Sequence, residues 1–106
     1  KARALVGERL WCAHFHDTRG MGLANAYAAW QTGIARFDAC LAGIGGCPHA
    51  PGASGNVTTE DLVFMFEAMG IKTGVNLEKL IYAGNTISTA LNKSSNSRVA
   101  KAMSKQ

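Results

Sequence analysis

Two short apolar runs with a helical segment between them constrain this sequence more than any other feature. Residues 9–16 are mostly apolar at both odd and even positions, as expected for a strand covered on both faces. Residues 37–41 form a second run of this kind after the helical segment. Strands joined by a helix pair in parallel through a right-handed crossover. The sequence therefore predicts an α/β fold built on a parallel sheet.

Start and stop signals define the helix between these runs. Asp17 or Thr18 is suited to cap its start, because short polar side chains accept hydrogen bonds from the first free N–H groups. Gly33 is suited to end it. The large apolar residues that recur at helical spacing are Leu23, Tyr27 and Trp30.

Three further helices are predicted downstream. A stub of strand at 56–57 precedes Thr58, which caps a helix that ends at Gly70. Another helix begins after Asn76, and a polar break at 93–97 precedes a short basic helix. The apolar positions of the first two of these helices are Leu62, Val63, Phe66, Met69, Leu77, Leu80, Ile81, Ile87 and Leu91.

The stretch at 43–55 is predicted to be a glycine-rich active-site loop. It holds five of the twelve glycines and both prolines, Pro48 and Pro51, so its backbone has unusual conformational demands. Loops of this length are commonly functional.

Charge and composition limit the partners. The net charge of +4 favours an anionic partner, such as a phosphate-bearing cofactor or nucleic acid, without choosing between them. Much of the positive excess lies near the two ends of the chain without interleaved aromatic residues, which is typical of solvated helix faces, so we expect no nucleic-acid partner. No apolar run reaches the ~18 residues that a membrane span requires, so we expect no membrane partner either.

The three cysteines point away from a disulfide framework. Cys12, Cys40 and Cys47 are odd in number and show no C-x-x-C spacing, so neither a set of disulfides nor a zinc knuckle is predicted. This pattern fits a reducing compartment best.

His14 and His16 are the first candidate site residues. Separated by one residue on a strand, they leave the same face ~6.6 Å apart, so two imidazoles can converge on one ion at the C-terminal end of a parallel strand. The alternative is a pair of histidines that form hydrogen bonds in a packed interior. Cys12 shares their parity but lies ~13 Å of extended strand from His16, too far to join the same ion, and is interpreted as a core residue.

Cys47 and Asn56 are the candidates in and after the loop. Glycines around Cys47 leave its thiol accessible and allow backbone amides to approach an anion, whereas the alternative is a loop cysteine without a role. Asn56 can supply a neutral oxygen ligand to a hard cation. Beside a glycine, it can equally be a turn residue.

Three segments in this order and spacing resemble the hydroxymethylglutaryl-CoA lyases. They are His-Phe-His-Asp-Thr-Arg-Gly at 14–20, Ala-Gly-Ile-Gly-Gly-Cys-Pro at 42–48, and Gly-Ala-Ser-Gly-Asn-Val-Thr-Thr-Glu-Asp-Leu at 52–62. The likeness covers nearly all of residues 10–100. Related aldolases and acyl-CoA synthases share the H-x-H but lack the glycine-cysteine loop in this form.

The resemblance implies a metal-dependent carbon–carbon lyase that cleaves 3-hydroxy-3-methylglutaryl-CoA to acetyl-CoA and acetoacetate with Mg²⁺ or Mn²⁺. It implies that His14 and His16 are metal ligands, with Asn56 in or close to the coordination sphere. It gives Cys47 the role of general acid or proton shuttle and makes His14 a candidate for proton transfer from the substrate hydroxyl.

The resemblance also implies a (β/α)8 TIM barrel, for which 106 residues are too few because a complete barrel needs ~250. We therefore expect residues 1–106 to be the C-terminal segment of one barrel domain, with about three parallel strands, their helices and further C-terminal helices. The chain begins at Lys1 and residues 1–8 read as the end of a helix, so we expect a missing upstream part. The N-terminal part of the barrel would then be a partner of this segment. Uncovered strand edges also favour a homo-oligomer.

Some features of the family are not found in this chain. The family's Arg-Asp pair from its first strand is absent, so the isolated segment is predicted to be inactive and a softer cation such as Zn²⁺ or Ni²⁺ to compete for the site. Arg19 stands where tyrosine is frequent, and His49 where an aromatic residue is common. The expected location is the cytoplasm for a bacterial protein and the mitochondrial matrix for a eukaryotic one.

Two other functions remain open from the sequence. The chain could be a non-catalytic module for metal binding or assembly, which requires a stable oligomer of 106-residue subunits. It could also belong to an aldolase for another acyl-CoA or 2-oxo acid, because specificity elements on earlier strands are not part of this sequence.

Overall fold

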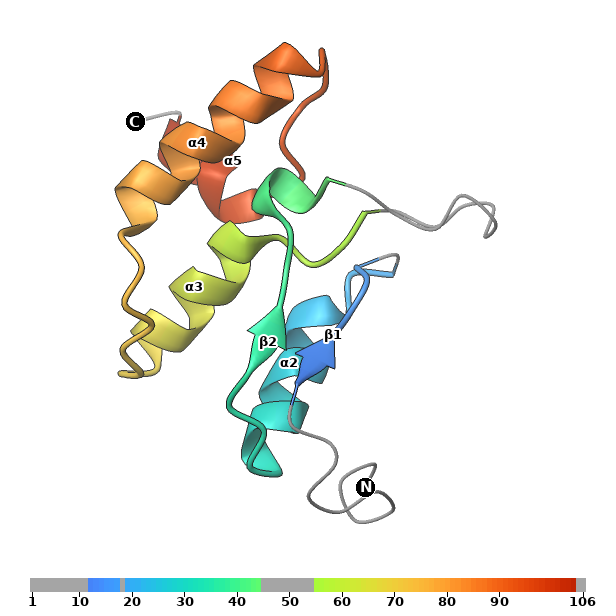
Figure 1. The fold of residues 1–106 in the computed structure, drawn as a ribbon, viewed down its shortest axis with the longest axis vertical. Helices are drawn as coiled ribbons and strands as arrows, with labels where there is room; N and C mark the ends of the chain where they lie inside the picture. Colours follow the sequence, from blue (N-terminus) through green and yellow to red (C-terminus); the bar gives the residue numbers. More distant parts are fainter. Residues whose placement is uncertain (1–11, 18, 45–54, 105–106) are drawn as a thin grey trace.

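A computed structural model of the chain describes residues 12–17, 19–44 and 55–104. It is an α/β fold with a two-stranded parallel sheet and helices around it (Figure 1). The predicted helix end at 1–8 and the first part of the strand predicted at 9–16 lie outside the described residues. In chain order the elements are β1 (Ala13–His14), α2 (Gly22–Gln31), β2 (Phe37–Asp38), the 3-10 helix η2 (Leu41–Gly43), α3 (Thr59–Ala68), α4 (Leu77–Ala90) and α5 (Arg98–Ser104).

The predicted parallel pairing of the two strands is confirmed. Ala13 is the register partner of Phe37, and His14 is the partner of Asp38. The second strand is shorter than the predicted 37–41, because the chain turns into η2 at Leu41. Within η2, Ala42 has a φ of 56°, a left-handed conformation that cannot continue a strand.

The expectation of about three parallel strands is wrong for the described residues, which contain two. The stub predicted at 56–57 appears only as isolated bridges, antiparallel between His16 and Asn56 and parallel between Cys40 and Thr58. Its backbone nevertheless lies between the two strand segments, because Val57 donates to Phe15 O (3.0 Å) and accepts from Cys40 N (3.1 Å). This short crossing segment leads directly into α3.

Helix caps follow the sequence signals closely. The Thr58 hydroxyl accepts from Asp61 N (3.2 Å) at the start of α3, and the Asn76 side chain accepts from Lys79 N (3.0 Å) at the start of α4. Gly33 and Gly70 follow the ends of α2 and α3 with φ of 99° and 85°. Such positive φ values favour glycine, so both predicted stops are confirmed.

The start of α2 differs from the prediction, and its packing face differs in part. Met21 occupies the N-cap position, although the Asp17 carboxylate does accept from Gly22 N (2.9 Å). The buried residues of α2 are Gly22 and Ala26, whereas Tyr27 is 40% exposed. The reason is a close approach at Gly22, where an added Cβ would overlap the Val57 side chain. The helix therefore packs through these small residues, with the predicted Leu23 partly buried against the core and the Trp30 ring beside Phe66.

The core lies where α2, β2 and α3 meet. Its central aromatic residue is Phe66, whose ring centroid is 5.2 Å from that of Phe37 and 6.4 Å from that of Trp30. The buried members of this cluster are Ala26, Val57, Leu62 and Phe66. These contacts fix the segment at 56–57 against the sheet.

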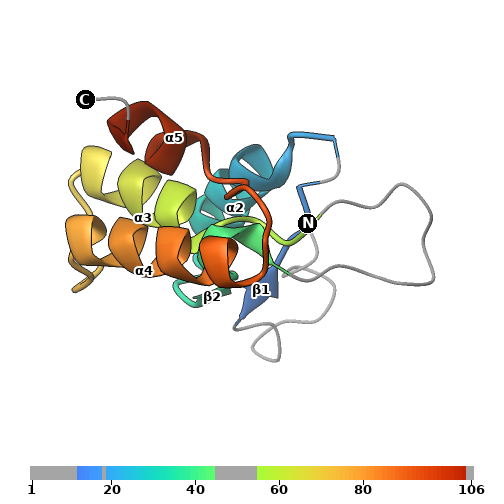
Figure 2. The same ribbon diagram turned by 90° about the horizontal axis from the view of Figure 1, so that it is seen from above.

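Helix α3 is the central helix, packed against α2, α4 and α5 (Figure 2). Asp61 fastens α5 to it: its carboxylate accepts from Ser97 Oγ (2.6 Å), Val99 N (3.0 Å) and Arg98 N (3.2 Å). The predicted polar break at 93–97 and the short basic helix after it are confirmed. None of the helices in the described part of the chain has the length and apolarity needed to cross a bilayer.

Candidate functional site

Polar side chains gather where β1 ends. His14 is the last residue of β1, His16 follows it by two positions, and Asn56 bridges to His16 from the segment that leads into α3. The carboxyl end of a parallel strand is the edge at which α/β folds build their sites. The structure thus brings together the three residues predicted as metal ligands.

Backbone hydrogen bonds hold this segment beside β1. Asp17 N donates to Gly55 O (3.3 Å) and Val57 N donates to Phe15 O (3.0 Å), so Asn56 is fixed between two bonded neighbours. On its other side, the segment is bonded to Cys40. The position of Asn56 is therefore set by the backbones of both strand segments.

The three side chains are in direct contact. His14 Nε2 and Asn56 Oδ1 are 2.9 Å apart, and the rings of His14 and His16 meet edge to face with centroids 5.3 Å apart. Both histidines are exposed, whereas Asn56 is half-buried. Among the described residues, the two histidines are therefore not enclosed in a packed interior.

The donor set fits a divalent cation in part. Two ligand atoms at right angles around Mg²⁺, each roughly 2.0–2.1 Å from it, are about 3 Å apart, close to the separation of His14 Nε2 and Asn56 Oδ1. Asp38, the register partner of His14, is exposed. Within 12–17, 19–44 and 55–104, however, no three His, Cys, Asp or Glu side chains form a group able to hold a metal. The described donors are thus two imidazoles and an amide.

The remaining candidates are distributed differently. Cys12, interpreted as a core residue, is a half-buried free thiol and is not among the buried core residues that the structure describes. Cys47 and most of the loop predicted at 43–55 lie outside the described residues, as does His49. Arg19 is exposed at the turn before α2.

Two partners of Asn56 were not predicted from the sequence. Its Nδ2 donates to Cys40 Sγ (2.8 Å) and to the Ile44 carbonyl (3.2 Å). The even spacing of Asp38 and Cys40 in the run at 37–41 could have placed the thiol on the same face as Asp38. The turn at η2, which brings Ile44 back to the site, had no clear signal in the sequence.

Glu60 contacts the backbone of η2 next to the site. Its side chain is completely buried, and both carboxylate oxygens accept from Ala42 N, at 2.9 and 3.0 Å. Burial raises the pKa of Glu60, and the Ala42 hydrogen bond opposes part of that rise. This contact fixes the left-handed turn that delivers Ile44 to Asn56.

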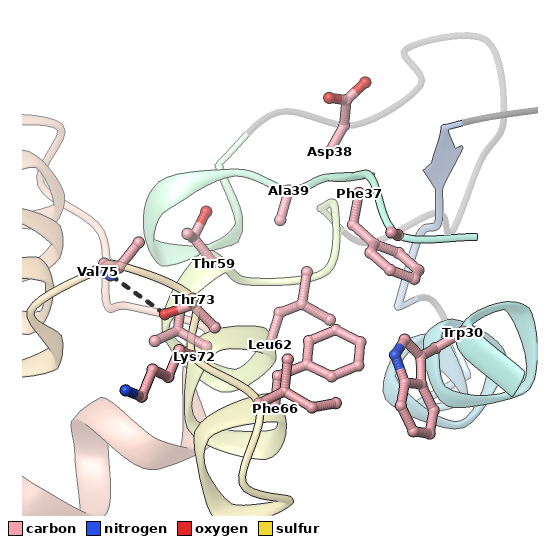
Figure 3. Close-up of a pocket in the computed structure, with 13 residues that line it drawn as sticks. Trp30, Phe37, Asp38, Ala39, Thr59, Leu62, Phe66, Lys72, Thr73 and Val75 are labelled. Carbon is pink, nitrogen blue, oxygen red and sulfur yellow. Dashed lines mark hydrogen bonds between the residues drawn. The ribbon is translucent and has the colours of Figure 1, made fainter. Parts of the chain in front are cut away.

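A cavity of about 480 Å³ lies away from these side chains. Figure 3 shows Phe37 and Ala39 pointing into it above Leu62 and Phe66 of α3, while Asp38 points the opposite way. The far wall is the segment at 71–75. None of the three clustered donors lines this cavity, so we place the candidate site at the end of β1.

Comparison with known proteins gives the same family from sequence and structure. The model of the HMGL-like family matches residues 3–87. Human mitochondrial hydroxymethylglutaryl-CoA lyase is 56% identical over 92 residues, which cover 87% of this chain and 28% of the human protein. The cytoplasmic 3-hydroxy-3-methylglutaryl-CoA lyase of Rattus norvegicus is 54% identical over 89 residues, covering 84% and 26%. The chain spans less than a third of these relatives.

Solved structures of bacterial enzymes have the same arrangement. The HMG-CoA lyase of Bacillus subtilis superposes with a TM-score of 0.87 at 47% identity, covering 96% of this chain and 35% of that one. The HMG-CoA lyase of Acinetobacter baumannii, solved with coenzyme A and 3-methylmalate, gives 0.85 at 48% identity, covering 95% and 33%. The similarity therefore extends through the described residues.

Proposed function

This chain belongs to the HMGL-like family, and on that basis we propose that it is part of an enzyme that cleaves 3-hydroxy-3-methylglutaryl-CoA to acetyl-CoA and acetoacetate. The resemblance to hydroxymethylglutaryl-CoA lyases seen in the sequence is confirmed. The observation that carries the proposal is the convergence of His14, His16 and Asn56 at the open end of β1.

The fold supports a place for this chain in a larger barrel. Among the described residues the sheet has two strands, far fewer than a closed barrel needs. The chain covers 35% of the Bacillus subtilis lyase. We infer that it is the C-terminal part of a TIM barrel and that the other strands are its partner.

The donor set supports a divalent cation, Mg²⁺ or Mn²⁺, as cofactor. His14, His16 and Asn56 would hold it through imidazole nitrogen and amide oxygen, with further ligands from the rest of the protein. When bound, such a cation lowers the pKa of a substrate hydroxyl and stabilises negative charge on oxygen. Without a carboxylate among these three donors, affinity in the isolated chain is expected to be low for hard cations.

Two side chains are assigned to proton transfer. His14, at the exposed end of β1, accepts the proton of the tertiary hydroxyl as the carbon–carbon bond breaks. Cys47 donates a proton to the carbon that becomes the methyl group of acetyl-CoA. The role of Cys47 rests on the family resemblance, since its position is outside the described residues.

A coupled assay for acetoacetate tests this function. The full-length protein carrying this chain should release acetoacetate from 3-hydroxy-3-methylglutaryl-CoA, and His16→Ala should abolish most turnover. The isolated 106-residue chain should be inactive; turnover near that of the intact enzyme would contradict its assignment as an incomplete site. Preference of the full-length protein for another acyl-CoA would show that it is a related aldolase.

Other aspects of the proposal concern the cell. The human relative is named mitochondrial and the rat relative cytoplasmic, so a matrix or cytoplasmic location is proposed according to the source. Because acetoacetate is a ketone body, we place the reaction in ketone-body formation and leucine degradation. A homo-oligomer is also proposed, and light scattering of the full-length protein tests it.

A further inference from the structure

We propose that Cys40 is a positioning residue that orients the Asn56 side chain toward the histidines. The proposal rests on the metal site of the proposed function and adds to it a thiol outside the predicted donor set. Asn56 Nδ2 lies 2.8 Å from Cys40 Sγ, while Asn56 Oδ1 lies 2.9 Å from His14 Nε2. One amide thus links the thiol to the histidine.

The orientation of this amide is determined by its partners. A backbone carbonyl only accepts hydrogen bonds, so the atom of Asn56 that faces Ile44 O at 3.2 Å must be Nδ2. Sulfur serves as a second, weaker acceptor on the same side. The opposite amide orientation would place Oδ1 against the Ile44 carbonyl, which has no proton to donate. Oδ1 therefore faces His14.

The position of Cys40 is fixed independently of its side chain. Its N–H donates to Val57 O (3.1 Å) and its carbonyl accepts from Thr59 N (3.0 Å), so its backbone is bonded on both sides of Thr58. The parallel bridge between Cys40 and Thr58 reflects this pairing. Since Asn56 lies on the same segment, Sγ and Nδ2 are carried by backbones that cannot move apart freely.

The consequence reaches His14. Because Asn56 Oδ1 only accepts, His14 Nε2 must carry the proton in the cation-free protein, which leaves the lone pair on Nδ1. If Cys40 stops holding Nδ2, only the Ile44 carbonyl still holds the amide, and this preference weakens. The His14 tautomer therefore reports on Cys40 without any metal ion present.

The first experiment measures that tautomer in the full-length protein. Imidazole ¹⁵N shifts of His14, recorded at a pH well above the ordinary histidine pKa of about 6.5, should show mainly Nε2–H. Cys40→Ala should give a mixture of tautomers, and Cys40→Ser, which keeps an acceptor, should restore Nε2–H. An unchanged tautomer in Cys40→Ala, or the same mixture in both variants, would overturn the proposal.

The second experiment measures Mn²⁺ affinity by the EPR signal of the free ion. Loss of a side chain that orients a metal ligand typically weakens binding about 10–100-fold, and we expect Cys40→Ala to lie near the tenfold end because Ile44 still holds the amide. In an Asn56→Ala background, Cys40→Ala should have no further effect. An equal loss in both backgrounds would mean that Cys40 acts on general structure, and the proposal would fail.

Cys12→Ala is the matched control, since Cys12 is the other free thiol among the described residues and lies outside the contacts of Asn56. It should leave both the tautomer and the Mn²⁺ affinity unchanged, and a change equal to that of Cys40→Ala would overturn the assignment. If the wild-type protein binds no Mn²⁺ but shows the expected tautomers, the metal function fails while the role of Cys40 stands.

Discussion

Asn56 and Glu60 lie four residues apart, but their surroundings differ: Asn56 lies beside exposed side chains, whereas Glu60 is buried and hydrogen-bonded. Asn56 belongs to the open cluster, which we define as His14, His16 and Asn56 and in which both histidines are exposed. Glu60 belongs with Asp61 to the saturated acidic pair, whose exposed fractions are 0% and 7%. Every oxygen of that pair accepts a hydrogen bond from the chain itself.

The segment at 56–61 therefore contributes both to the stability of the fold, through Glu60 and Asp61, and to the candidate site, through Asn56. A buried carboxylate is costly unless N–H and O–H groups surround it, and the pair meets this condition at Ala42, Ser97 and the start of α5. In the described part of the chain, no buried side-chain polar atom lacks a partner. The open cluster leaves imidazole nitrogens at the surface. We therefore expect stability to depend on the pair, and ligand binding on the cluster.

The largest expected effect is on Asp61. Asp61→Ala removes the acceptor of Ser97 Oγ and of two N–H groups at the start of α5, so unfolding in urea should show a loss of about 2–4 kcal/mol. Asp61→Asn, which keeps one acceptor oxygen, is the control and should lose less. A loss below about 0.5 kcal/mol, the usual range of surface substitutions, would show that the hydrogen bonds accepted by Asp61 do not stabilise the fold.

At Gly84, replacement by alanine should destabilise the fold, the opposite of its usual effect in a helix. In an ordinary helix interior Gly→Ala stabilises by about 1 kcal/mol, but at Gly84 an added Cβ would overlap the Glu60 carboxylate. We expect Gly84→Ala to destabilise by about 1–3 kcal/mol, as overpacking does. In a Glu60→Ala background the same change should become neutral or stabilising. Additive effects of the two changes would rule out the contact.

A smaller effect concerns the pH dependence of Glu60. Burial raises its pKa above the ordinary 4.5, so the folded chain binds this proton more tightly than the unfolded chain. That contribution to stability is complete below about pH 4.5 and is lost as the pH rises through the folded pKa. Glu60→Gln keeps size and an acceptor oxygen without the charge.

Urea unfolding across this range checks the expectation. The difference in unfolding free energy, Glu60→Gln minus wild type, should increase as the pH rises above 4.5. Glu67→Gln is a control of opposite sign. The hydrogen bond from Thr73 lowers the pKa of the exposed Glu67, so its contribution is lost as the pH falls. A flat difference for Glu60→Gln would contradict the raised pKa.

The elements that local chemistry determines were predictable. Thr58 and Asn76 cap helices, Gly33 and Gly70 end them, and H-x-H on a strand places two imidazoles together whatever surrounds them. The packing face of α2 was only partly predictable: Leu23 and Trp30 do contact the core, but the burial of Gly22 depends on the close approach of Val57, which has no signal in the sequence.

The partners of Asn56 and Glu60 were equally hidden in the sequence. The contacts of Asn56 with Ile44 and of Glu60 with Ala42 depend on Ala42 adopting a left-handed conformation, which no residue preference favours for alanine. The carboxylate of Glu60 accepts from Ala42 N, 18 residues away in the sequence, and the turn at Ala42 brings the Ile44 carbonyl to Asn56. Such contacts arise from the tertiary fold, so a sequence pattern could name Asn56 as a candidate but could not identify what orients it.

The smallest expected change in stability is at His16. This residue tests whether the open cluster contributes to ligand binding rather than to stability. Its ring is exposed and meets the edge of the His14 ring, so His16→Ala should alter the free energy of unfolding of the metal-free protein by less than about 0.5 kcal/mol. Mn²⁺ affinity of the same variant should fall at least tenfold, because one of the described nitrogen donors is lost. Asp61→Asn is the converse control: it should reduce stability while the folded protein binds Mn²⁺ as the wild type does. If His16→Ala instead destabilised the protein as much as Asp61→Ala, the open cluster would be part of the fold's own stabilisation and its assignment as a ligand site would lose its basis.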